Sequence, residues 1–490
     1  MPVKTILTQN FILRQDSYKS SHFKQIPKKV KRVQSTIVAR KPSKYVKRIV
    51  VAGTQYLARY LASVTITEED VLEAEIENQE QGYEFNKEGW MRIVNECGGK
   101  LPLRVRALPE GTVVRPGTSM CQIENTTDWS GWLPSFVETE AQCIVWKFST
   151  VASIAKHCYG TIHKFAEMTG SPLDMVAFGL HNFGDRGADS HEAAAWSGIA
   201  HGMIFNGSDS LKTNLNIKRL YKTKKAYLSS VEATEHSTMC MNSDAANRND
   251  YGAAVMAVER LEAVVQRVKE KGIGIPLMSV VIDTYDSHRF VRDFIGSPEL
   301  KARIINSGGK LVLRPDSGDP LLEPIQILNI LGEVFGYTIN EKGYKVLPPY
   351  VGVLQGDGIN ERSLEMILAN VMAAGWATGN LVFGMGGGLT HEAGRDEFSF
   401  SQKATAMSYD SVLDQVDEWI SLKKEPITDL GKTSLSGYIV NVVRDGEVVS
   451  IDRRTMAAND VIADVTIFEN GDDSFVDTVN FDDVRTRAAA

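Results

Sequence analysis

The sequence contains few cysteines and no long apolar run. Its 490 residues include five cysteines, none of them in a C-x-x-C pair, which excludes a disulfide framework and gives no sign of a zinc site. Scattered cysteines of this kind are typical of a reducing compartment. The chain has no run of about 18 apolar residues and no apolar signal core near its first residue. We therefore expect a cytoplasmic protein that is not bound to a membrane.

Positive charge is in deficit overall but is concentrated locally. The formal net charge is −7, which argues against a general nucleic-acid binder. Residues 24–48 nevertheless carry ten Lys or Arg and no acid, whereas residues 464–483 are acidic. The basic stretch indicates either a solvated, lysine-rich edge or a contact surface for a polyanion, and composition alone leaves both open.

A structural repeat occupies the middle of the chain. Short apolar runs rich in β-branched residues are each followed by a polar or glycine-containing turn, and segments with helical periodicity separate them. The turns lie roughly 30 to 40 residues apart, which is the length of a βα unit. The runs are 278–282, 311–313, 350–354 and 380–383, and the clearest helical segments are 319–336 and 360–375. The pattern predicts parallel strands joined by crossover helices.

Each apolar run leads directly into polar residues. These are "DTYD" (283–286), "RPDSGD" (314–319), "QGDG" (355–358) and "GMGGG" (384–388). In a βα barrel or an open doubly wound sheet, ligands bind beyond the carboxyl ends of the strands. We therefore predict an α/β domain over residues 171–395, either a βα barrel or an open doubly wound sheet, with its site at this face. Short strands in residues 1–170 and 396–490 predict a second, β-rich α+β domain built from both chain ends.

The stretch "FGMGGGLTHEAGRD" (383–396) places glycines where the backbone approaches a ligand or turns tightly. It is not a dinucleotide fingerprint, because Leu389 occupies the third glycine position, and it lacks the lysine of a Walker A loop. The only G-K-T sequence, 431–433, has Pro426 where that motif's first glycine belongs. A tight loop without a ligand is one interpretation. The interpretation we favour is a phosphate held by backbone NH groups, with Arg395 as its countercharge.

Charged side chains accompany these turns. Carboxylates at strand ends can hold Mg²⁺ or accept hydrogen bonds from sugar hydroxyls, and arginines neutralise phosphate. Any one of them could instead form a surface salt bridge, but the whole set at one face favours a phosphate-bearing substrate. The acids are Asp209, Asp283, Asp316 and Asp357, and the bases are Arg186, Arg314, Arg395 and Lys403.

The motifs also occur together in a known family. "DSYK", "HNFGDRG", "TEHST", "RPDSGDP", "QGDG" and "FGMGGG" stand in the order and at the spacing of the nicotinamide phosphoribosyltransferase family, which the chain resembles from about residue 10 to about residue 440. The resemblance implies the irregular α/β barrel of type II phosphoribosyltransferases beside a β-rich domain, and a homodimer with two active sites at its interface. The implied reaction, part of NAD salvage, joins nicotinamide to 5-phosphoribosyl 1-pyrophosphate with Mg²⁺, giving nicotinamide mononucleotide and pyrophosphate.

The resemblance implies roles for residues around the base. Tyr18 and Phe183 would sandwich the nicotinamide, and Asp16 belongs to the same substrate-binding segment as Tyr18. Arg186 would lie at the edge of the base, and Asp209 would accept a hydrogen bond from the carboxamide. Nicotinate is the alternative substrate, and its negative charge would be repelled by Asp209.

The remaining implied roles concern ribose, phosphates and ATP. Arg314 would lie by the base, with Asp316 and Asp357 accepting from ribose hydroxyls. His236 matches a histidine that is phosphorylated from ATP, which couples hydrolysis to tighter substrate use. Gly356, Gly386, Gly387 and Arg395 would hold the ribose phosphate, and Arg40, Lys403, Lys424 and Asp283 would surround pyrophosphate and Mg²⁺, with Asp283 as the metal ligand.

Two positions depart from the family pattern. Asp185 replaces a tyrosine of the vertebrate enzymes, and Gly352 replaces an arginine, so the entrance to the base site and the phosphate contacts are expected to differ. The alternatives are a nicotinate phosphoribosyltransferase and a catalytically silent, phosphoribosyl-binding homologue, although a silent homologue would be expected to have lost some of these residues. An isomerase or aldolase barrel would need a Lys or Glu base at a strand end, which we do not find.

Overall fold

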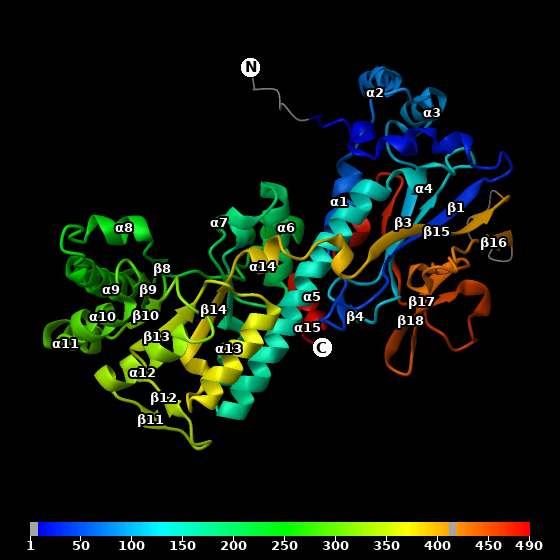
Figure 1. Cartoon of the computed structure of the whole chain (residues 1–490). Coiled ribbons are helices and arrows are strands. Elements are labelled where there is room, and N and C mark those ends of the chain that lie inside the picture. The colour runs from blue at the N-terminus through cyan, green and yellow to red at the C-terminus, as the bar shows by residue number, and fades with distance from the viewer. Residues whose placement is uncertain (1–7, 411–417) are drawn as a thin grey trace. The chain divides into compact units, whose positions relative to one another are not determined.

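The computed structural model describes residues 8–410 and 418–490 (Figure 1). Contacts divide the chain into two compact units. The first unit contains the described residues up to Ser153, residues 217–224 and the described residues from 393 onward, and the second contains residues 154–216 and 225–392. The domain boundaries derived from the sequence stay a prediction. Nowhere in the described residues is there a helix with the length and apolar character needed to span a membrane.

The second unit is built on a parallel sheet (Figure 1). Among the described residues, its strands run in the order β7-β6-β14-β13-β10-β9-β8, and neighbouring strands are parallel. The predicted α/β architecture with crossover helices is confirmed. The strands are β6 Leu180–Asn182, β7 Gly207–Ser208, β8 Glu232–Ala233, β9 Leu277–Val281, β10 Lys310–Arg314, β13 Val351–Gln355 and β14 Leu381–Met385.

The sheet curls until its two edges approach each other. Gly207 in the edge strand β7 forms a parallel bridge with Ser229, which precedes the opposite edge strand β8. The NH of Ser208 donates to the carbonyl of Ser229 at 3.0 Å, and the NH of Ser229 donates to the carbonyl of Asn206 at 2.8 Å. Both edge strands are short, so the barrel is irregular at this seam.

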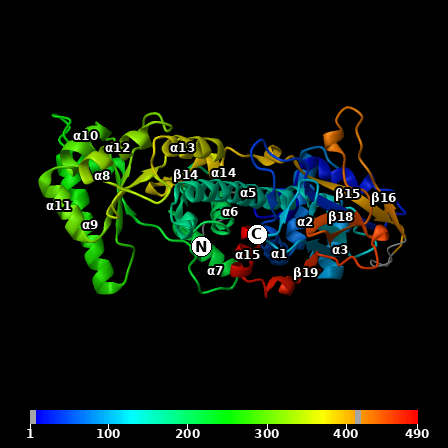
Figure 2. The ribbon, with the colours of Figure 1, turned by 90° about the horizontal axis from the view of Figure 1, so that it is seen from below.

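Helices cover the outer face of the curled sheet. α9 and α11 pack against each other and lie side by side in both views (Figures 1 and 2). α12 begins at Glu323 rather than at 319, because the Asp319 side chain first closes a turn by accepting from the NH of Leu321 at 2.9 Å. The helices are α6 His191–Gly202, α7 Leu211–Leu220, α8 His236–Met241, α9 Tyr251–Lys271, α10 Ser287–Arg289, α11 Pro298–Ser307, α12 Glu323–Phe335, α13 Glu361–Ala373 and α14 Gly387–Thr390, and a small hairpin joins β11 Thr338–Ile339 to β12 Lys345–Val346.

The first unit contains an antiparallel sheet formed by both ends of the chain. In the part of the chain that the structure describes, its order is β16-β15-β1-β5-β3-β19. β1 pairs with β15, and β3 pairs with β19, so the N-terminal strands β1, β5 and β3 form the middle of the sheet and C-terminal strands flank them on both sides. The predicted second, β-rich domain is thereby confirmed. The strands are β1 Arg32–Ala39, β3 Leu103–Ala107, β5 Ser119–Asn125, β15 Phe400–Ser408, β16 Trp419–Ser421 and β19 Val465–Glu469.

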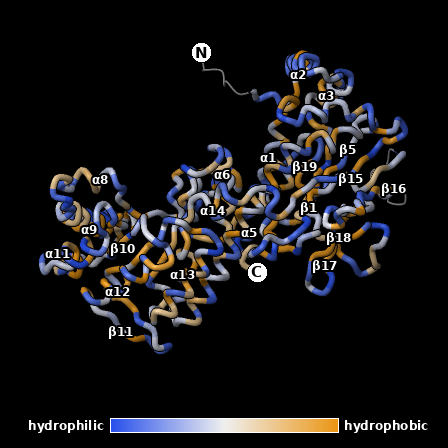
Figure 3. The backbone as a smooth tube through the Cα atoms, viewed as in Figure 1, coloured by the Kyte–Doolittle hydropathy of each residue, from blue (hydrophilic) through white to orange (hydrophobic). Residues whose placement is uncertain are grey.

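Smaller elements complete the first unit. β17 Ile439–Arg444 and β18 Glu447–Asp452 form a hairpin whose turn residues, Asp445 and Gly446, have φ angles of 51° and 76°, as a type I′ turn requires. Much of α2 is hydrophilic (Figure 3), because it carries many acidic side chains. The remaining elements are the pair β2 Ile49–Val50 and β4 Val113–Val114, and the helices α1 Thr54–Ser63, α2 Glu68–Glu80, α3 Lys87–Cys97, α4 Leu133–Phe136, α5 Glu138–Thr169 and α15 Phe481–Ala489.

The acidic C-terminal residues pack within the first unit. Asp477 forms ion pairs with Arg59 at 2.7 Å and with Lys222 at 2.5 Å. Phe481, at the start of α15, is fully buried, and its ring centroid lies 4.7 Å from that of Tyr221. Residues 217–224, which include the end of α7, belong to the first unit. The C-terminal segment therefore holds them in this unit.

A buried carboxylate anchors the same region. The hydroxyl of Tyr221 donates to Oε2 of Glu110 at 2.6 Å, and the NH of Gly53 donates to Oε1 at 2.5 Å. Burial raises the pKa of Glu110. Nε of Arg487, in α15, donates to the backbone carbonyl of Glu110 at 2.8 Å. Tyr221 and α15 thus share one anchor.

Replacing Phe481 with alanine should destabilise the first unit. Removing a fully buried phenylalanine costs about 3–5 kcal/mol, and the lost side chain is the one that packs on Tyr221. Chemical denaturation followed by intrinsic fluorescence measures the change. Phe475→Ala is the matched control because Phe475 is 44% exposed. Equal stability of the two variants would contradict a structural role for the C-terminal segment.

Candidate active site

Polar residues follow the carboxyl ends of the strands in the second unit. Because the strands are parallel, the turns that leave these ends share one edge of the sheet. The site residues predicted for this unit therefore lie along one edge. In sheet order they are Asp209 after β7, Phe183 and Arg186 after β6, Gly386 and Gly387 after β14, Gly356 and Asp357 after β13, Arg314 and Asp316 at the end of β10, Asp283 after β9 and His236 after β8.

His236 lies between two carboxylates at this edge. Its Nε2 is 3.0 Å from Oδ1 of Asp283, and its Nδ1 is 4.0 Å from Oδ2 of Asp316. The Asp283 side chain is 10% exposed, whereas the imidazole is 46% exposed. The nearly buried carboxylate thus orients the ring by accepting from Nε2–H. In the neutral imidazole, Nδ1 then keeps its lone pair on an accessible ring.

The Phe183 ring lies against the backbone of β14. A Cβ placed on Gly384 would overlap Cε2 of Phe183, and a Cβ on Gly356 would lie 3.4 Å from the same atom. The guanidinium carbon of Arg314 is 6.0 Å from the ring centroid. Glycine at position 384 is therefore required by the packing of this ring, and Arg314 reaches toward it from β10.

Asp209 has one carboxylate oxygen that is occupied and one that is free. Its NH donates to the carbonyl of Asn182 at 3.1 Å, and Oγ of Ser230 donates to Oδ1 at 2.6 Å. Within the described residues, Oδ2 has no hydrogen-bond donor. Burial lowers the pKa of His181 in β6, and the negative charge of Asp209 opposes that shift. Oδ2 is available to accept a hydrogen bond from a ligand.

The glycines of "GMGGG" fall into two classes. A Cβ on Gly388 would lie 2.5 Å from the carbonyl oxygen of Ile359, closer than real Cβ contacts. Glycine is therefore required at 388, as it is at 384, for packing alone. These two positions say nothing about a ligand.

Gly386 and Gly387 belong to the other class. A Cβ on Gly386 would meet only the carbonyl oxygen of Phe183, at 3.6 Å, and a Cβ on Gly387 would meet only Oε1 of Glu392, at 3.5 Å. Both are ordinary van der Waals distances, so internal packing permits a side chain here. The space beside these two glycines is open to a ligand that approaches the backbone.

Arg186 and Asp357 are exposed at the same edge. Arg186 lies in the turn η4 (Gly184–Gly187) and has no ion-pair partner among the described residues. The turn at Asp357 is shaped by Gln355, whose Nε2 donates to the carbonyl of Asp357 at 3.0 Å. Both charged groups are accessible to a ligand.

Lys310 occupies the space beside Gly352. A Cβ on Gly352 would lie 2.8 Å from Cε and 3.2 Å from Nζ of Lys310. Burial lowers the pKa of Lys310. Because β10 and β13 pair directly, the amino group of Lys310 lies beside position 352, although Gly352 itself has no side chain.

The predicted segment Asp16–Tyr18 lies in the first unit. The NH of Asp16 donates to Oγ1 of Thr139 at 3.2 Å, and this hydroxyl donates to Oδ2 of Asp16 at 2.7 Å. Tyr18 is 52% exposed. Its ring lies edge-on to His22, with centroids 5.0 Å apart, and Nζ of Lys19 is 5.3 Å from its centroid. Tyr18 is therefore held in place while much of its ring stays accessible.

Glu138 links two lysines near Tyr18. Nζ of the buried Lys19 lies 2.7 Å from Oε2 of Glu138, and Nζ of Lys403 lies 3.5 Å from Oε1. Tyr18 and Lys403 line a cavity of about 220 Å³. Lys403 and Arg40 line a second cavity of about 310 Å³. The structure thus brings Tyr18, Lys403 and Arg40 into one neighbourhood of the first unit.

Two other predicted basic residues are placed differently. Arg395 pairs with its neighbour Asp396 at 3.0 Å, and both side chains are exposed. The NH of Lys424 donates to Oγ of Ser434 at 2.9 Å, and Ser434 lines the cavity that contains Arg40. The backbone of Lys424 is therefore bonded to a residue that lines this cavity, whereas the described contacts of Arg395 do not connect it to either cavity.

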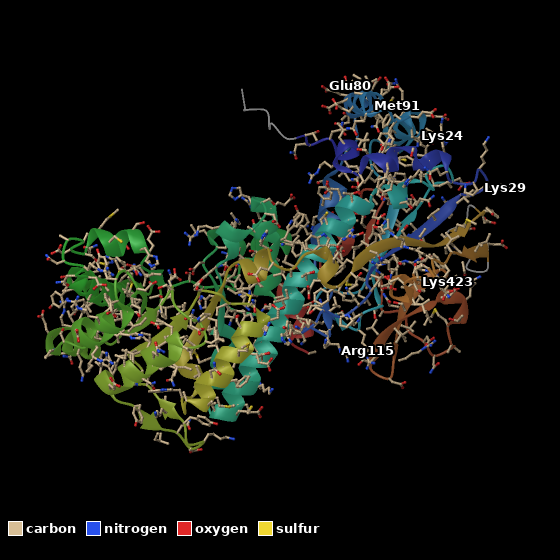
Figure 4. All side chains as sticks on the ribbon, viewed as in Figure 1. Lys24, Lys29, Glu80, Met91, Arg115 and Lys423 are labelled. Carbon is tan, nitrogen blue, oxygen red and sulfur yellow. The ribbon has the colours of Figure 1, made fainter. Side chains whose placement is uncertain are left out.

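Part of the basic stretch 24–48 is an ion-paired edge. Lys24 and Lys29 extend outward from the first unit (Figure 4). Ion pairs join Lys24 to Glu84, Arg32 to Asp128, and Arg48 to Glu447. Arg40 differs because its guanidinium donates to the carbonyl and hydroxyl of Ser399 at 2.9 and 3.0 Å and also lines a cavity.

Sequence reasoning missed the residues that hold the candidate side chains. Ser230, which binds Asp209, and Glu138, which binds Lys403, lie far from their partners in the chain. Lys19 binds Glu138 as well, and its place within the "DSYK" motif marks it in the sequence. The sequence carries no comparable signal for Ser230 or Glu138.

Two family models and a bacterial relative match the sequence of this chain. A model of the nicotinate phosphoribosyltransferase (NAPRTase) family matches residues 178–474. A model of the nicotinamide phosphoribosyltransferase N-terminal domain matches residues 10–105. A protein of Xanthomonas campestris pv. campestris named nicotinamide phosphoribosyltransferase is 36% identical over 469 residues, which cover 94% of this chain and 95% of that protein.

Solved structures share the fold. A nicotinate-nucleotide pyrophosphorylase from Pyrococcus furiosus has a TM-score of 0.60 at 14% identity, covering 100% of this chain and 97% of that chain. Human nicotinic acid phosphoribosyltransferase has a TM-score of 0.53 at 15% identity, covering 99% of this chain and 93% of that chain. At such identities the likeness concerns the fold alone. The family model and the bacterial relative establish that the chain belongs to the nicotinate phosphoribosyltransferase family.

Proposed function

We propose that the chain transfers the phosphoribosyl group of 5-phosphoribosyl 1-pyrophosphate to nicotinamide, giving nicotinamide mononucleotide and pyrophosphate in NAD salvage. One observation carries this proposal. An aromatic ring, a carboxylate with a free oxygen and an open pair of glycines follow the three adjacent strands β6, β7 and β14. A flat amide base and a phosphate are the ligands that such groups suit.

Base recognition rests on Phe183, Tyr18 and Asp209. The two aromatic rings stack on the faces of nicotinamide, and Arg186 lies at its edge. The carboxamide NH₂ donates to Oδ2 of Asp209, the oxygen that no described residue occupies. Nicotinate would instead place a second negative charge beside Asp209, so nicotinamide is the preferred base.

Ribose and its phosphate occupy the middle of the edge. Asp316 and Asp357 accept hydrogen bonds from ribose hydroxyls, and Arg314 lies between them and the base. The 5-phosphate approaches the backbone at Gly386 and Gly387, where a Cβ would fill the open space. Gly356 belongs to the adjoining ribose-phosphate turn, and Arg395 is the proposed countercharge.

Mg²⁺ is the proposed metal cofactor, and the residues present fit it. No group of three or more His, Cys, Asp or Glu that could hold a metal occurs in the described residues. Mg²⁺ is commonly bound through one or two carboxylates together with substrate phosphates. Asp283 would be the protein ligand, and bound Mg²⁺ would neutralise charge on the leaving pyrophosphate. Arg40, Lys403 and Lys424 supply further positive charge.

ATP coupling is proposed through His236. Its Nε2–H donates to Asp283, so the lone pair of Nδ1 is the nucleophile for the γ-phosphate of ATP. The N–P bond forms as the bond to ADP breaks, and water later hydrolyses the phosphohistidine. Asp283 keeps the ring in the required tautomer.

The transfer itself needs no side-chain nucleophile. Departure of pyrophosphate leaves positive charge on C1 of the ribose, and the pyridine nitrogen of nicotinamide then forms the new bond to C1. Asp316 and Asp357 hold the ribose during this step, and Phe183 fixes the direction of attack. The cations near the pyrophosphate stabilise the charge that develops on it.

The proposal extends to assembly and location. Tyr18 lies in the first unit and Phe183 in the second, and we infer a cytoplasmic homodimer in which each site takes Tyr18 from one subunit and Phe183 from the other. Neither nucleic acid nor a membrane is part of the proposed function.

The decisive experiment supplies Mg²⁺, 5-phosphoribosyl 1-pyrophosphate and either nicotinamide or nicotinate, and identifies the mononucleotide by mass spectrometry. Nicotinamide mononucleotide is the expected product, formed faster when ATP is added. Nicotinate mononucleotide as the main product would support the sister activity instead. Absence of both products, in protein shown to be folded, would support a silent homologue.

Asp209→Asn should lower kcat/KM for nicotinamide by about tenfold, because a hydrogen bond to a charged acceptor is lost. The same change should improve the relative use of nicotinate, because the repulsion of its carboxylate is removed. Steady-state kinetics with both bases measures the ratio. An unchanged base preference would remove Asp209 from base recognition.

Gly387→Ala should raise KM for 5-phosphoribosyl 1-pyrophosphate on the order of tenfold, because a methyl group would block phosphate from the backbone NH groups. KM for nicotinamide should change far less. The variant should fold, since its Cβ meets only Glu392 at an ordinary distance. Gly388→Ala is the contrast, because a Cβ there collides with Ile359 and should reduce the yield of folded protein.

Two inactive variants, Tyr18→Ala and Arg314→Ala, should complement each other when co-expressed. Random pairing makes half of the dimers mixed, and each mixed dimer contains one intact site, so about a quarter of wild-type activity is the ceiling. Differential tagging verifies that mixed dimers form. Mixed dimers without activity would mean that each site is built within one chain.

A further inference from the structure

The turn η4, Gly184–Gly187, connects two proposed subsites of the second unit. It directly follows Phe183, which stacks on the base, and it carries Arg186. α14, which begins at Gly387 in the proposed phosphate site, packs against this turn. The turn therefore touches both the base side and the phosphate side.

On the base side, Asp185 binds the segment that follows β7. Its Oδ2 accepts from Oγ of Ser210 at 3.0 Å and from Nζ of Lys212 at 3.1 Å. Ser210 directly follows Asp209, and Lys212 is the second residue of α7. Two donors that converge on one oxygen restrain geometry better than a single exposed ion pair. The position of the turn is thereby tied to that of Asp209.

On the phosphate side, the glycines of the turn contact α14. Oγ1 of Thr390 lies 3.2 Å from the carbonyl oxygens of both Gly184 and Gly386, either of which can accept its proton, and a Cβ on Gly184 would overlap the Thr390 side chain. A Cβ on Gly187 would lie 3.7 Å from Cα of Gly387. The NH of Gly184 also donates to Oδ1 of Asn182 at 2.8 Å. The backbone at Gly387, in the proposed phosphate site, therefore lies directly beside the turn.

We propose that Asp185 is a positioning residue through which occupation of the phosphate site raises the affinity for the base. The turn is only four residues long and is bonded at Gly184 and Asp185, so a shift near Gly187 moves Arg186 and the Asp185 carboxylate together. Ser210 and Lys212 pass this shift to Asp209. The inference rests on the proposed function.

Binding of nicotinamide measured by calorimetry, with and without saturating ribose 5-phosphate, tests the coupling. Ribose 5-phosphate should raise the affinity of wild-type protein for nicotinamide at least about fivefold, the lower range of allosteric couplings. Asp185→Ala should bring this ratio close to one. By reciprocity, nicotinamide should raise the affinity for ribose 5-phosphate by the same factor.

Further variants separate positioning from general damage. Asp185→Asn keeps an acceptor for Ser210 and loses the charge that attracts Lys212, so its ratio should be intermediate, and Lys212→Met should match it. Thr390→Val removes the donor to Gly184 from the opposite side and should lower the same ratio. Asp174→Asn is the control, because Asp174 is an exposed carboxylate before β6 and should leave the ratio unchanged.

The outcomes are distinguishable. A wild-type ratio of one, or an undiminished ratio in folded Asp185→Ala, would overturn the inference while wild-type synthesis of nicotinamide mononucleotide still supports the proposed function. If the wild-type protein makes no nicotinamide mononucleotide, the proposed function itself is contradicted. If Asp185→Ala does not fold, the ratios of Lys212→Met and Thr390→Val decide, and wild-type values in both would overturn the inference.

Discussion

Parallel pairing of the strands from β7 to β8 is the constraint on which the candidate site depends. Since every strand in this sheet runs in the same direction, every turn that leaves a carboxyl end reaches the same edge. Residues as distant in the chain as Phe183 and Arg314 meet there, with the guanidinium 6.0 Å from the ring centroid. Curling of the sheet to the bridge at Gly207 and Ser229 also draws the outermost turns inward.

The aromatic ring at this edge imposes a second constraint. Phe183 lies where a side chain at Gly384 would stand, so part of the glycine-rich stretch serves packing. Gly386 and Gly387 follow Met385, the last residue of β14. Both glycines have space beside them. The same run of glycines therefore both accommodates a ring and leaves a backbone surface open, and only the second property bears on a ligand.

The role of each charged side chain depends on the groups that it contacts in the fold, rather than on how many charges lie near it in the sequence. Arg32 and Arg48 of the basic stretch form ion pairs with acids of the first unit, and the C-terminal Asp477 binds Arg59 and Lys222. Arg40, whose guanidinium binds Ser399 rather than an acid, instead lines a cavity. A cation that is held beside a cavity can meet an anionic substrate, whereas one neutralised by an ion pair contributes mainly to the surface of the fold.

The sequence by itself determined the strands β9, β10, β13 and β14 and the polar residues at their ends, because apolar runs and helical periodicity are local properties. It also determined the family, through motifs whose order and spacing are properties of the chain. The roles of the individual site residues stay predictions. Only the tertiary structure decided which glycines serve packing, which residues hold Asp209 and Lys403, and where the acidic C-terminal segment lies. These depend on atoms of Ile359, Ser230, Glu138 and Tyr221, which come into contact through folding and leave no periodic signal in the sequence.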